Sequence, residues 1–207
     1  MPYLLRPMEA GDVPVVTAID RLSFPTPWPS AAFHHELRRD RAYYYVLLRP
    51  RQKEVSSSNR NWGGWLRRHL DPAKGSRIVG YVGFRLRDGE GHITTIAVHP
   101  AWRGRGFGAL LLTAALDEML QHGVDAVTLE TRPTNKVAHQ LYHQYGFKVE
   151  RRRRGYYRDG EDAWVMTSQV DSEGYRQRLA DLREALEERL LDERIEVGHV
   201  RGRAQRS

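Results

Sequence analysis

The 207-residue sequence contains no cysteine, and this absence removes several classes of chemistry. Disulfide bonds, thiolate metal sites and covalent acyl-cysteine intermediates all need a thiol. A chain without disulfides fits a reducing compartment, so we predict a cytoplasmic protein. Apolar runs are also short: the longest lies near residues 109–116, well below the ~20 residues of a membrane helix. The first residues lack the apolar core of a signal peptide, and we expect no membrane partner.

Lysine is scarce as well, although the formal net charge is +7. Nearly all of the basic charge is therefore arginine, a side chain that suits bidentate contacts with phosphate. A basic balance points to polyanionic partners such as RNA or a phosphorylated cofactor, without naming one. The arginine run at 151–154 is compatible with a solvated strand edge, with an RNA contact or with part of a substrate slot.

One turn between a predicted strand and a predicted helix has the composition of a phosphate-binding site. The strand-like segment Ile96-Ala97-Val98 leads into a turn and then a helix pattern, and the turn reads Arg103-Gly104-Arg105-Gly106-Phe107-Gly108-Ala109. Glycines let successive backbone N–H groups converge, and the helix start favours an anion. A nucleotide P-loop needs a Gly-Lys-Ser/Thr ending, which is missing. A dinucleotide fold carries its loop after the first strand, whereas several candidate strands precede this one.

The loop pattern Arg103-x-x-Gly106-x-Gly108 resembles the pyrophosphate loop of the Gcn5-related N-acetyltransferases (GNAT), which bind acetyl-coenzyme A (acetyl-CoA). The resemblance covers roughly residues 3–169. Further segments are similar to the RimI branch, which acetylates the N-terminal alanine of a small-subunit ribosomal protein. These segments are Phe24 to Trp28, Leu129 to Arg132, Asn135, Ala138, Leu141-Tyr142, Gly146-Phe147, Arg153 to Tyr157 and Gly160 to Met166.

The resemblance implies acetyl-CoA as co-substrate and no metal. The cofactor residues that it implies are Ile96, Ala97, Val98, Arg103, Gly104, Arg105, Gly106, Phe107, Gly108, Ala109 and Asn135. The Val98 backbone N–H is expected to donate to the thioester oxygen. Asn135 stands at a predicted helix start, where capping of the helix is the alternative role.

Two side chains are candidates for proton transfer. Without a cysteine to carry the acetyl group, the amine must attack the thioester directly. Glu130 ends a predicted strand on the face opposite Val127 and Leu129, so we assign it as general base, directly or through water. The alternative is an ordinary ion pair with Arg132. Tyr142 matches the family's general acid, but it also belongs to an apolar helical stripe, so packing is the alternative.

Proton equilibria favour an α-amine as acceptor. At pH 7 roughly one α-amine in seven is neutral, against about one lysine in 2500, for pKa values near 7.8 and 10.4. The resemblance implies, in addition, an N-terminal alanine acetyltransferase acting on a ribosomal protein, with Trp28, Tyr156 and Tyr157 in the peptide slot, and this is the function that we predict. The alternatives are another protein N-terminus, a lysine, a small amine, or a non-catalytic ribosome- or RNA-binding module.

Hydrophobic periodicity predicts an α/β layer fold with a mixed sheet. The family resemblance implies the three-layer GNAT type of this fold, with a mixed, mostly antiparallel sheet flanked by helices. Predicted strands span 3–6, 42–48, 78–86, 91–98, 126–131, 147–152 and 163–169, and predicted helices span 12–22, 30–39, 109–121 and 135–145. Residues 1–170 form the predicted acetyltransferase domain, with an inserted segment at 50–77 that could hold a short helix at 65–70.

Residues 171–207 are predicted to form an amphipathic helix and a basic tail, with 201–207 disordered. The apolar stripe at 175–191 either folds back on the domain, pairs with another subunit or docks on a ribosomal or other protein. Elsewhere, His139 and His143 stand one helical turn apart, but no third ligand accompanies them, and we predict no metal.

Overall fold

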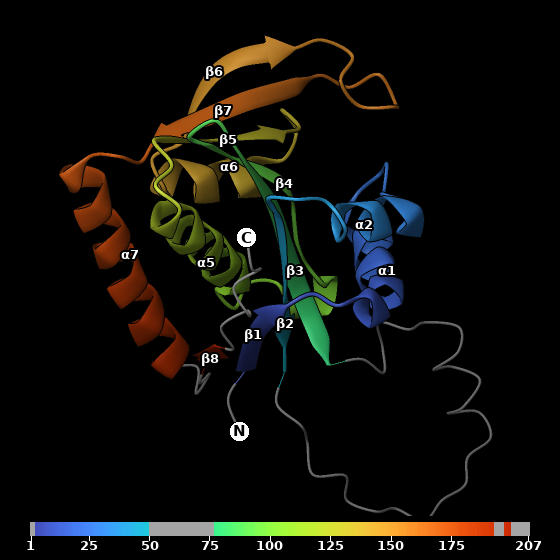
Figure 1. Cartoon of the computed structure of the whole chain (residues 1–207), viewed down its shortest axis with the longest axis horizontal. Coiled ribbons are helices and arrows are strands. Elements are labelled where there is room, and N and C mark those ends of the chain that lie inside the picture. Colours follow the sequence, from blue (N-terminus) through green and yellow to red (C-terminus); the bar gives the residue numbers. More distant parts are fainter. Residues whose placement is uncertain (1–2, 50–76, 193–196, 200–207) are drawn as a thin grey trace, which may run out of the picture.

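The computed structural model describes residues 3–49, 77–192 and 197–199, and its centre is an eight-stranded sheet (Figure 1). The strand order is β6-β7-β5-β4-β3-β2-β1-β8. The strands are β1 (Tyr3–Pro7), β2 (Ala42–Leu48), β3 (Ile78–Arg87), β4 (Glu90–Val98), β5 (Ala126–Thr131), β6 (Lys148–Arg153), β7 (Ala163–Gln169) and β8 (Val197–His199). Among these described strands, only β4–β5 and β1–β8 pair in parallel. The predicted mixed, mostly antiparallel sheet is therefore confirmed among the described residues.

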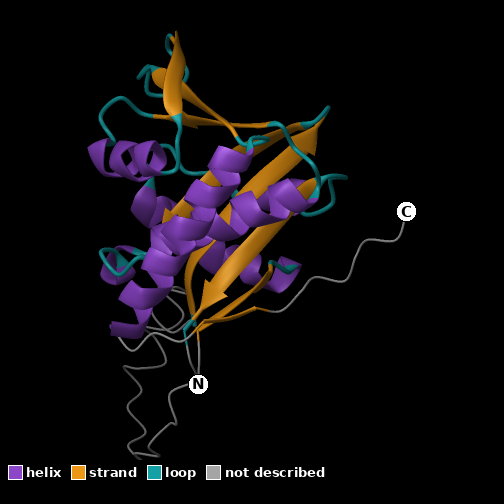
Figure 2. Cartoon of the chain, turned by 90° about the vertical axis from the view of Figure 1, so that its left-hand side faces the viewer, coloured by secondary structure: helices purple, strands orange, loops and turns teal. Residues whose placement is uncertain are grey.

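Helices cover both faces of this sheet (Figures 1 and 2). On one face lie α1 (Val13–Ser23) and α2 (Ser30–Glu36); on the other lie α5 (Phe107–Gln121), α6 (Lys136–Gln144) and α7 (Glu173–Asp192). Short 3-10 turns occupy Ala10–Asp12 and Pro100–Trp102. Each face has its own apolar cluster, with Phe33 and Tyr81 central to one and Leu111 and Phe147 to the other. The predicted three-layer α/β architecture is confirmed.

Local turn chemistry explains most element boundaries. Asp88 and Gly89 both have positive φ and close the β3–β4 hairpin, as an Asp-Gly pair predicts. Gly146, at φ +81°, follows the end of α6. Two predicted bounds differ by more than one residue: α2 ends at Glu36 rather than near residue 39, and α5 begins two residues before Ala109. Helix termini are the part of a periodic pattern that sequence reasoning places least well.

The parallel strands β4 and β5 separate partway along their length. They pair from Glu90–Ala126 to Ile93–Leu129, and both strands continue beyond this point without each other. In the same place the β3–β4 register shifts, because Gly83 opposes Thr95 while Phe84 opposes Ile93, which leaves Thr94 as an extra residue. Such bulges bend a strand and redirect its side chains. The separation opens the sheet at its centre.

Helix α7 folds back on the domain, which is one of the three arrangements that the sequence left open. Its apolar side chains Tyr175, Leu179, Leu186 and Leu190 are buried in the same cluster as the core of α5. Beyond α7, strand β8 pairs with β1, an element that the sequence did not predict. The inserted segment at 50–77, except for residue 77, and the tail at 201–207 lie outside the described residues. Within the described part of the chain, no helix is long and apolar enough to cross a membrane.

Candidate active site

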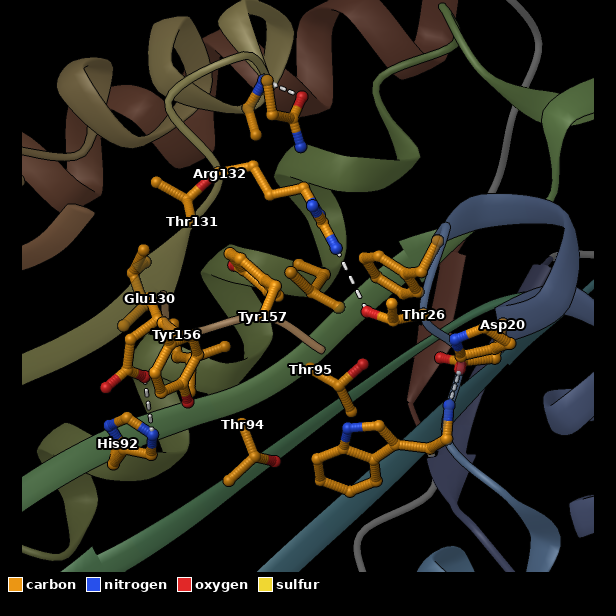
Figure 3. A pocket seen from close by; sticks show the side chains of 18 of the residues that line it. Asp20, Thr26, His92, Thr94, Thr95, Glu130, Thr131, Arg132, Tyr156 and Tyr157 are labelled. Atoms are coloured by element: carbon orange, nitrogen blue, oxygen red, sulfur yellow. Dashed lines mark hydrogen bonds and ion pairs between the residues drawn. The ribbon is translucent and has the colours of Figure 1, made fainter. Parts of the chain in front are cut away.

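A cleft of about 500 Å³ lies where β4 and β5 separate (Figure 3). Residues from both strands line it, together with residues from the α1–α2 segment, α6 and the β6–β7 loop. Seven of the predicted site residues meet in its wall: Trp28, Ile96, Glu130, Asn135, Tyr142, Tyr156 and Tyr157. The predicted loop at 103–109 is not part of this wall. It follows β4 and leads into α5.

The Glu130 carboxylate is held between two basic side chains. Its Oε2 lies 3.2 Å from His92 Nε2, and its Oε1 accepts a hydrogen bond of 3.0 Å from Arg153 Nη1. The side chain is only 13% exposed. Burial alone would raise the pKa of Glu130, but His92 and then Arg153 outweigh it and lower the pKa below its ordinary value. Glu130 is therefore an ionised carboxylate at neutral pH, able to accept further hydrogen bonds.

His92 is a site residue that the sequence analysis missed. The parallel register of β4 and β5 sets it opposite Thr128, and its Nδ1 lies 3.0 Å from the Thr128 hydroxyl oxygen. The two ring nitrogens thus connect Thr128 to Glu130, and Figure 3 shows the imidazole facing the carboxylate. A histidine in an alternating strand carries no local signal. Its role depends on which strand lies beside it.

Tyr142 packs in the core and also reaches the cleft. Its side chain is 7% exposed and packs against Phe147, with ring centroids 5.9 Å apart, so it belongs to the core. It also lines the cleft. Burial raises the pKa of Tyr142 above the ordinary value of a phenol. The phenol therefore stays protonated at neutral pH and can donate a hydrogen bond into the cleft.

The glycine loop has the backbone conformation that its sequence predicts at two of three glycines. Gly104 and Gly106 both have φ of +80°, a region that side chains disfavour, and Gly106 caps α5. Gly108 lies inside the first turn of α5 instead. A Cβ there would meet Leu141 at an ordinary 3.6 Å. The first amides of α5 have no partners within the helix, as in any helix start, and this end favours an anion.

The two loop arginines differ in their contacts. Arg103 donates from Nε to the Val98 carbonyl at 3.1 Å and from Nη2 to the Ser23 hydroxyl at 3.1 Å. It therefore braces the end of β4 against α1. The guanidinium of Arg105 lies 4.9 Å from the ring centroid of Trp102. Both side chains keep further N–H donors, because a guanidinium carries five.

The backbone of β4 presents unpaired donors toward the open side. His99 N–H donates to the Val79 carbonyl at 2.9 Å. Because hydrogen-bonded and non-hydrogen-bonded pairs alternate along an antiparallel ladder, Val98 and Ile96 occupy the non-hydrogen-bonded positions opposite Gly80 and Val82. Their N–H groups therefore point away from β3, toward the edge that β5 has left. This places the predicted Val98 donor on the open edge.

Asn135 caps α6, since its Oδ1 accepts from the Ala138 N–H at 3.2 Å, and it also lines the cleft. On the opposite wall, buried Asp20 accepts from the Trp28 N–H at 2.6 Å and from the Tyr81 hydroxyl. Burial raises the pKa of Asp20, and those two hydrogen bonds oppose the rise. Asp20 thus fixes the position of Trp28, although nothing local in the sequence singles it out.

Arg132 joins three loops over the cleft. It pairs with Asp159 at 2.9 Å and with Glu161, and its Nη2 donates to the Thr26 hydroxyl at 3.1 Å. The guanidinium also lies 3.9 Å from the ring centroid of Tyr157 (Figure 3). The sequence offered Arg132 as the partner of Glu130. That pairing is wrong, because Arg153 approaches Glu130 from β6 and Arg132 faces the β6–β7 loop instead.

The arginine run and the histidine pair singled out in the sequence are the remaining candidates. Within the arginine run, Arg153 stacks on Tyr156 at 4.5 Å and enters the site, whereas Arg152 pairs with Asp162. His139 stacks on Trp164, with centroids 4.6 Å apart, and its buried Nε2 has no hydrogen-bond partner. Among the described residues, no group of three or more metal-ligating side chains gathers in one place.

Comparison with known proteins identifies the relatives of this arrangement. The sequence model of the Acetyltransferase (GNAT) family matches residues 15–147. The N-alpha-acetyltransferase RimI of Mycobacterium tuberculosis is 34% identical over 145 residues, which are 68% of this chain and 74% of the relative.

Two solved structures share the fold. The ribosomal-protein-S18-alanine N-acetyltransferase of Escherichia coli superposes with a TM-score of 0.64 at 24% identity, covering 82% of this chain and 95% of that one. Arabidopsis thaliana NAA60 in complex with acetyl-CoA gives 0.64 at 17% identity, covering 82% and 99%. These relationships favour an enzyme over a non-catalytic module, and the chain belongs to the GNAT family of N-acetyltransferases.

Proposed function

We propose that this acetyltransferase binds acetyl-CoA and transfers its acetyl group to the α-amine of a protein N-terminus, the N-terminal alanine of a small-subunit ribosomal protein. The observation that carries the proposal is the shared cleft. A carboxylate, Glu130, and a protonated phenol, Tyr142, line one cavity beside the open edge of β4. The mycobacterial RimI relative supports an N-terminal acceptor.

In this mechanism Glu130 takes the proton that the attacking amine loses. The lowered pKa of Glu130 makes it a weak base toward a free ammonium ion. A neutral amine, however, becomes far more acidic once its C–N bond to the thioester carbon forms. An ionised carboxylate, directly or through water, is then sufficient to accept the proton. His92 and Arg153 keep Glu130 in that ionised form.

Negative charge also develops on the thioester oxygen and on the leaving sulfur, and Val98 and Tyr142 stabilise these two charges. The Val98 N–H stabilises the negative charge that develops on the thioester oxygen. Tyr142 donates a hydrogen bond to the departing sulfur. A thiol has an ordinary pKa of about 8.5, against about 10 for a phenol, and burial raises the pKa of Tyr142 further. Tyr142 therefore stabilises the thiolate mainly by hydrogen bonding, since full proton transfer from it would be uphill.

The carrier is assigned to the loop at 103–109, with its diphosphate against the amides of the loop and of the α5 start. Gly104 and Gly106 adopt the left-handed backbone conformation, which glycine accepts without a side-chain clash. The acetyl-CoA complex of the plant enzyme NAA60, which has the same fold, supports this co-substrate. On the acceptor side, Trp28, Tyr156 and Tyr157 frame the slot for the peptide.

Acetylation of matched peptides tests the acceptor. One peptide carries a free alanine terminus, the second is blocked at its terminus and carries one internal lysine, and a polyamine represents small amines. We expect the alanine terminus to have the highest kcat/KM at pH 7, and termini that begin with other residues to be slower. Preference for the lysine or the polyamine would refute the assignment. Comparing protein N-termini in cells with and without the gene would then identify the natural acceptor.

A further inference from the structure

Helix α7 lies against the back of the glycine loop. At Gly106, a Cβ atom would come within 3.2 Å of Leu186 and 3.6 Å of Leu190, so the loop is packed directly on the helix. Next to this contact, Arg189 Nη2 donates to the Gly104 carbonyl oxygen at 2.6 Å. The loop is therefore held by a side chain that lies far outside the segment matched by the family model, residues 15–147.

This hydrogen bond fixes the direction of a loop amide. In a planar trans peptide, the carbonyl of one residue and the N–H of the next point in opposite directions. Since the Gly104 carbonyl is turned toward α7, the N–H of Arg105 points to the other side of the loop. That side is the one free to receive an anion. A glycine at 104 with φ of +80° has little conformational preference of its own, so an external contact is needed to select one orientation.

The remainder of α7 anchors the helix without touching the loop. Arg183 pairs with Asp117 of α5. Nearer the start of α7, Tyr175 donates from its hydroxyl to the Tyr145 carbonyl at 3.2 Å, and Arg178 donates to the Gln144 carbonyl at 3.1 Å. These carbonyls belong to the C-terminal end of α6. The helix is thus fixed to α5 and α6, and Arg189 extends from a fixed base.

We propose that Arg189 is a positioning residue for the acyl carrier: it orients the Arg105 amide so that this N–H can donate to the diphosphate of acetyl-CoA. The inference rests on the proposed function, because it assumes that the loop at 103–109 receives that diphosphate. Under this proposal, α7 contributes to carrier binding through Arg189. In a purely structural role, α7 would cover the apolar face of α5 and nothing more.

Two full-length variants separate these roles. Arg189→Met removes the contact with the Gly104 carbonyl, and Arg183→Met removes an anchor of the same helix that does not reach the loop. Calorimetry measures the Kd for acetyl-CoA and for acetyl-dephospho-CoA, which keeps the diphosphate but lacks the 3′-phosphate. Thermal unfolding measures Tm. Arg189→Lys, which keeps a donor at this position, serves as the conservative variant.

We expect Arg189→Met to weaken both carriers equally, by roughly five- to ten-fold, the range implied by one misdirected hydrogen-bond donor. Arg183→Met should bind like the wild type, and Arg189→Lys should recover part of the loss. An unchanged Kd in Arg189→Met overturns the proposal. The proposal is also overturned if Arg189→Met and Arg183→Met lose carrier affinity to the same extent and their Tm values fall in parallel. It is equally overturned if Arg189→Met weakens binding of acetyl-CoA but not of acetyl-dephospho-CoA. If the wild type itself binds neither carrier, the proposed function fails instead.

Discussion

The carrier side and the acceptor side of the cleft are built by different means. On the carrier side, the proposed contacts come from backbone amides of one continuous loop, 103–109, and from the edge of β4. On the acceptor side, they come from side chains of separate segments that are held by ion pairs, such as Glu130 with His92 and Arg153. The carrier side therefore depends on backbone conformation, and the acceptor side depends on charge. Substitutions should affect the two sides independently.

Replacing Glu130 with glutamine should give the largest effect, and on the acceptor side alone. It removes the proposed proton acceptor, so we expect kcat to fall by roughly 10²- to 10⁴-fold, the contribution typical of a general base. The Kd for acetyl-CoA should stay at its wild-type value. Steady-state acetylation of an alanine peptide and calorimetry measure the two quantities. Glu150→Gln is the control, because Glu150 accepts a hydrogen bond from Thr167 away from the cleft. Near-normal turnover in Glu130→Gln would rule out its role as base.

Gly106→Ala should act on the carrier side alone. An L side chain in the left-handed region costs about 1–2 kcal/mol, and the new Cβ would also press on Leu186. We expect the Kd for acetyl-CoA to rise about ten-fold, with kcat at saturation less affected. Gly108→Ala is the matched control, since Gly108 is helical and has room for a methyl group in the structure. If Gly108→Ala weakens acetyl-CoA binding as much as Gly106→Ala does, the loop requires glycine because the carrier approaches its backbone closely, and not because of a positive φ.

Arg132→Met tests whether the charge network positions the acceptor peptide. Without the guanidinium, Asp159 and Glu161 repel one another, and Tyr157 and Thr26 lose their contact with it. We expect the peptide KM to rise by about ten-fold, equivalent to about 1.4 kcal/mol. The Kd for acetyl-CoA should not change. Arg87→Met, which breaks an ion pair with the exposed Asp88, provides the reference. A change in carrier affinity in Arg132→Met would break the separation between the two sides.

His92→Gln should give the smallest effect, visible in the pH profile of kcat. His92 lowers the pKa of Glu130, so its loss raises that pKa. The base must be ionised, and activity is lost as the pH falls through its pKa. The acid limb of the variant should therefore lie at higher pH than that of the wild type. An acid limb that stays in place, or moves down, would show that His92 does not act through Glu130.

The carrier side was largely predictable from the sequence because its determinants are local. The positive φ of Gly104 and Gly106 and the helix start after them each follow from residue types within a few positions. The Val98 donor was expected through the family resemblance, and the register of β3 and β4 turns its N–H toward the open edge. Only Gly108 differs, since its place in the helix demands no special backbone conformation.

On the acceptor side, the family resemblance predicted that Glu130 and the aromatic residues Trp28, Tyr156 and Tyr157 lie near one another, and they do line one cleft. The ion pairs of the acceptor side were not predictable, because they connect segments that are distant in sequence. Glu130 and Arg132 are near neighbours in the chain, and this proximity suggested a pair that the structure does not form. The partner chosen instead, Arg153, comes from β6 and depends on the order of strands in the sheet.

In the C-terminal segment, the helix was predictable from the sequence, but its packing partner and strand β8 were not. The spacing of Leu179, Leu186 and Leu190 correctly indicated an amphipathic helix, because periodicity identifies an apolar face. Periodicity does not identify what that face covers, and the sequence left three alternatives open. Strand β8 spans only Val197–His199, too short a run to produce a recognisable pattern.

The parallel pairing of β8 with β1 has a consequence for synthesis. Among the described strands, β1 leaves the ribosome first and β8 last. The helix that contacts the glycine loop also emerges late, just ahead of β8. A nascent polypeptide can therefore assemble most of its sheet while the outer edge of β1 still awaits a partner and Gly104 still lacks the arginine that contacts it. The enzyme would acquire its final form only after β8 has been synthesised.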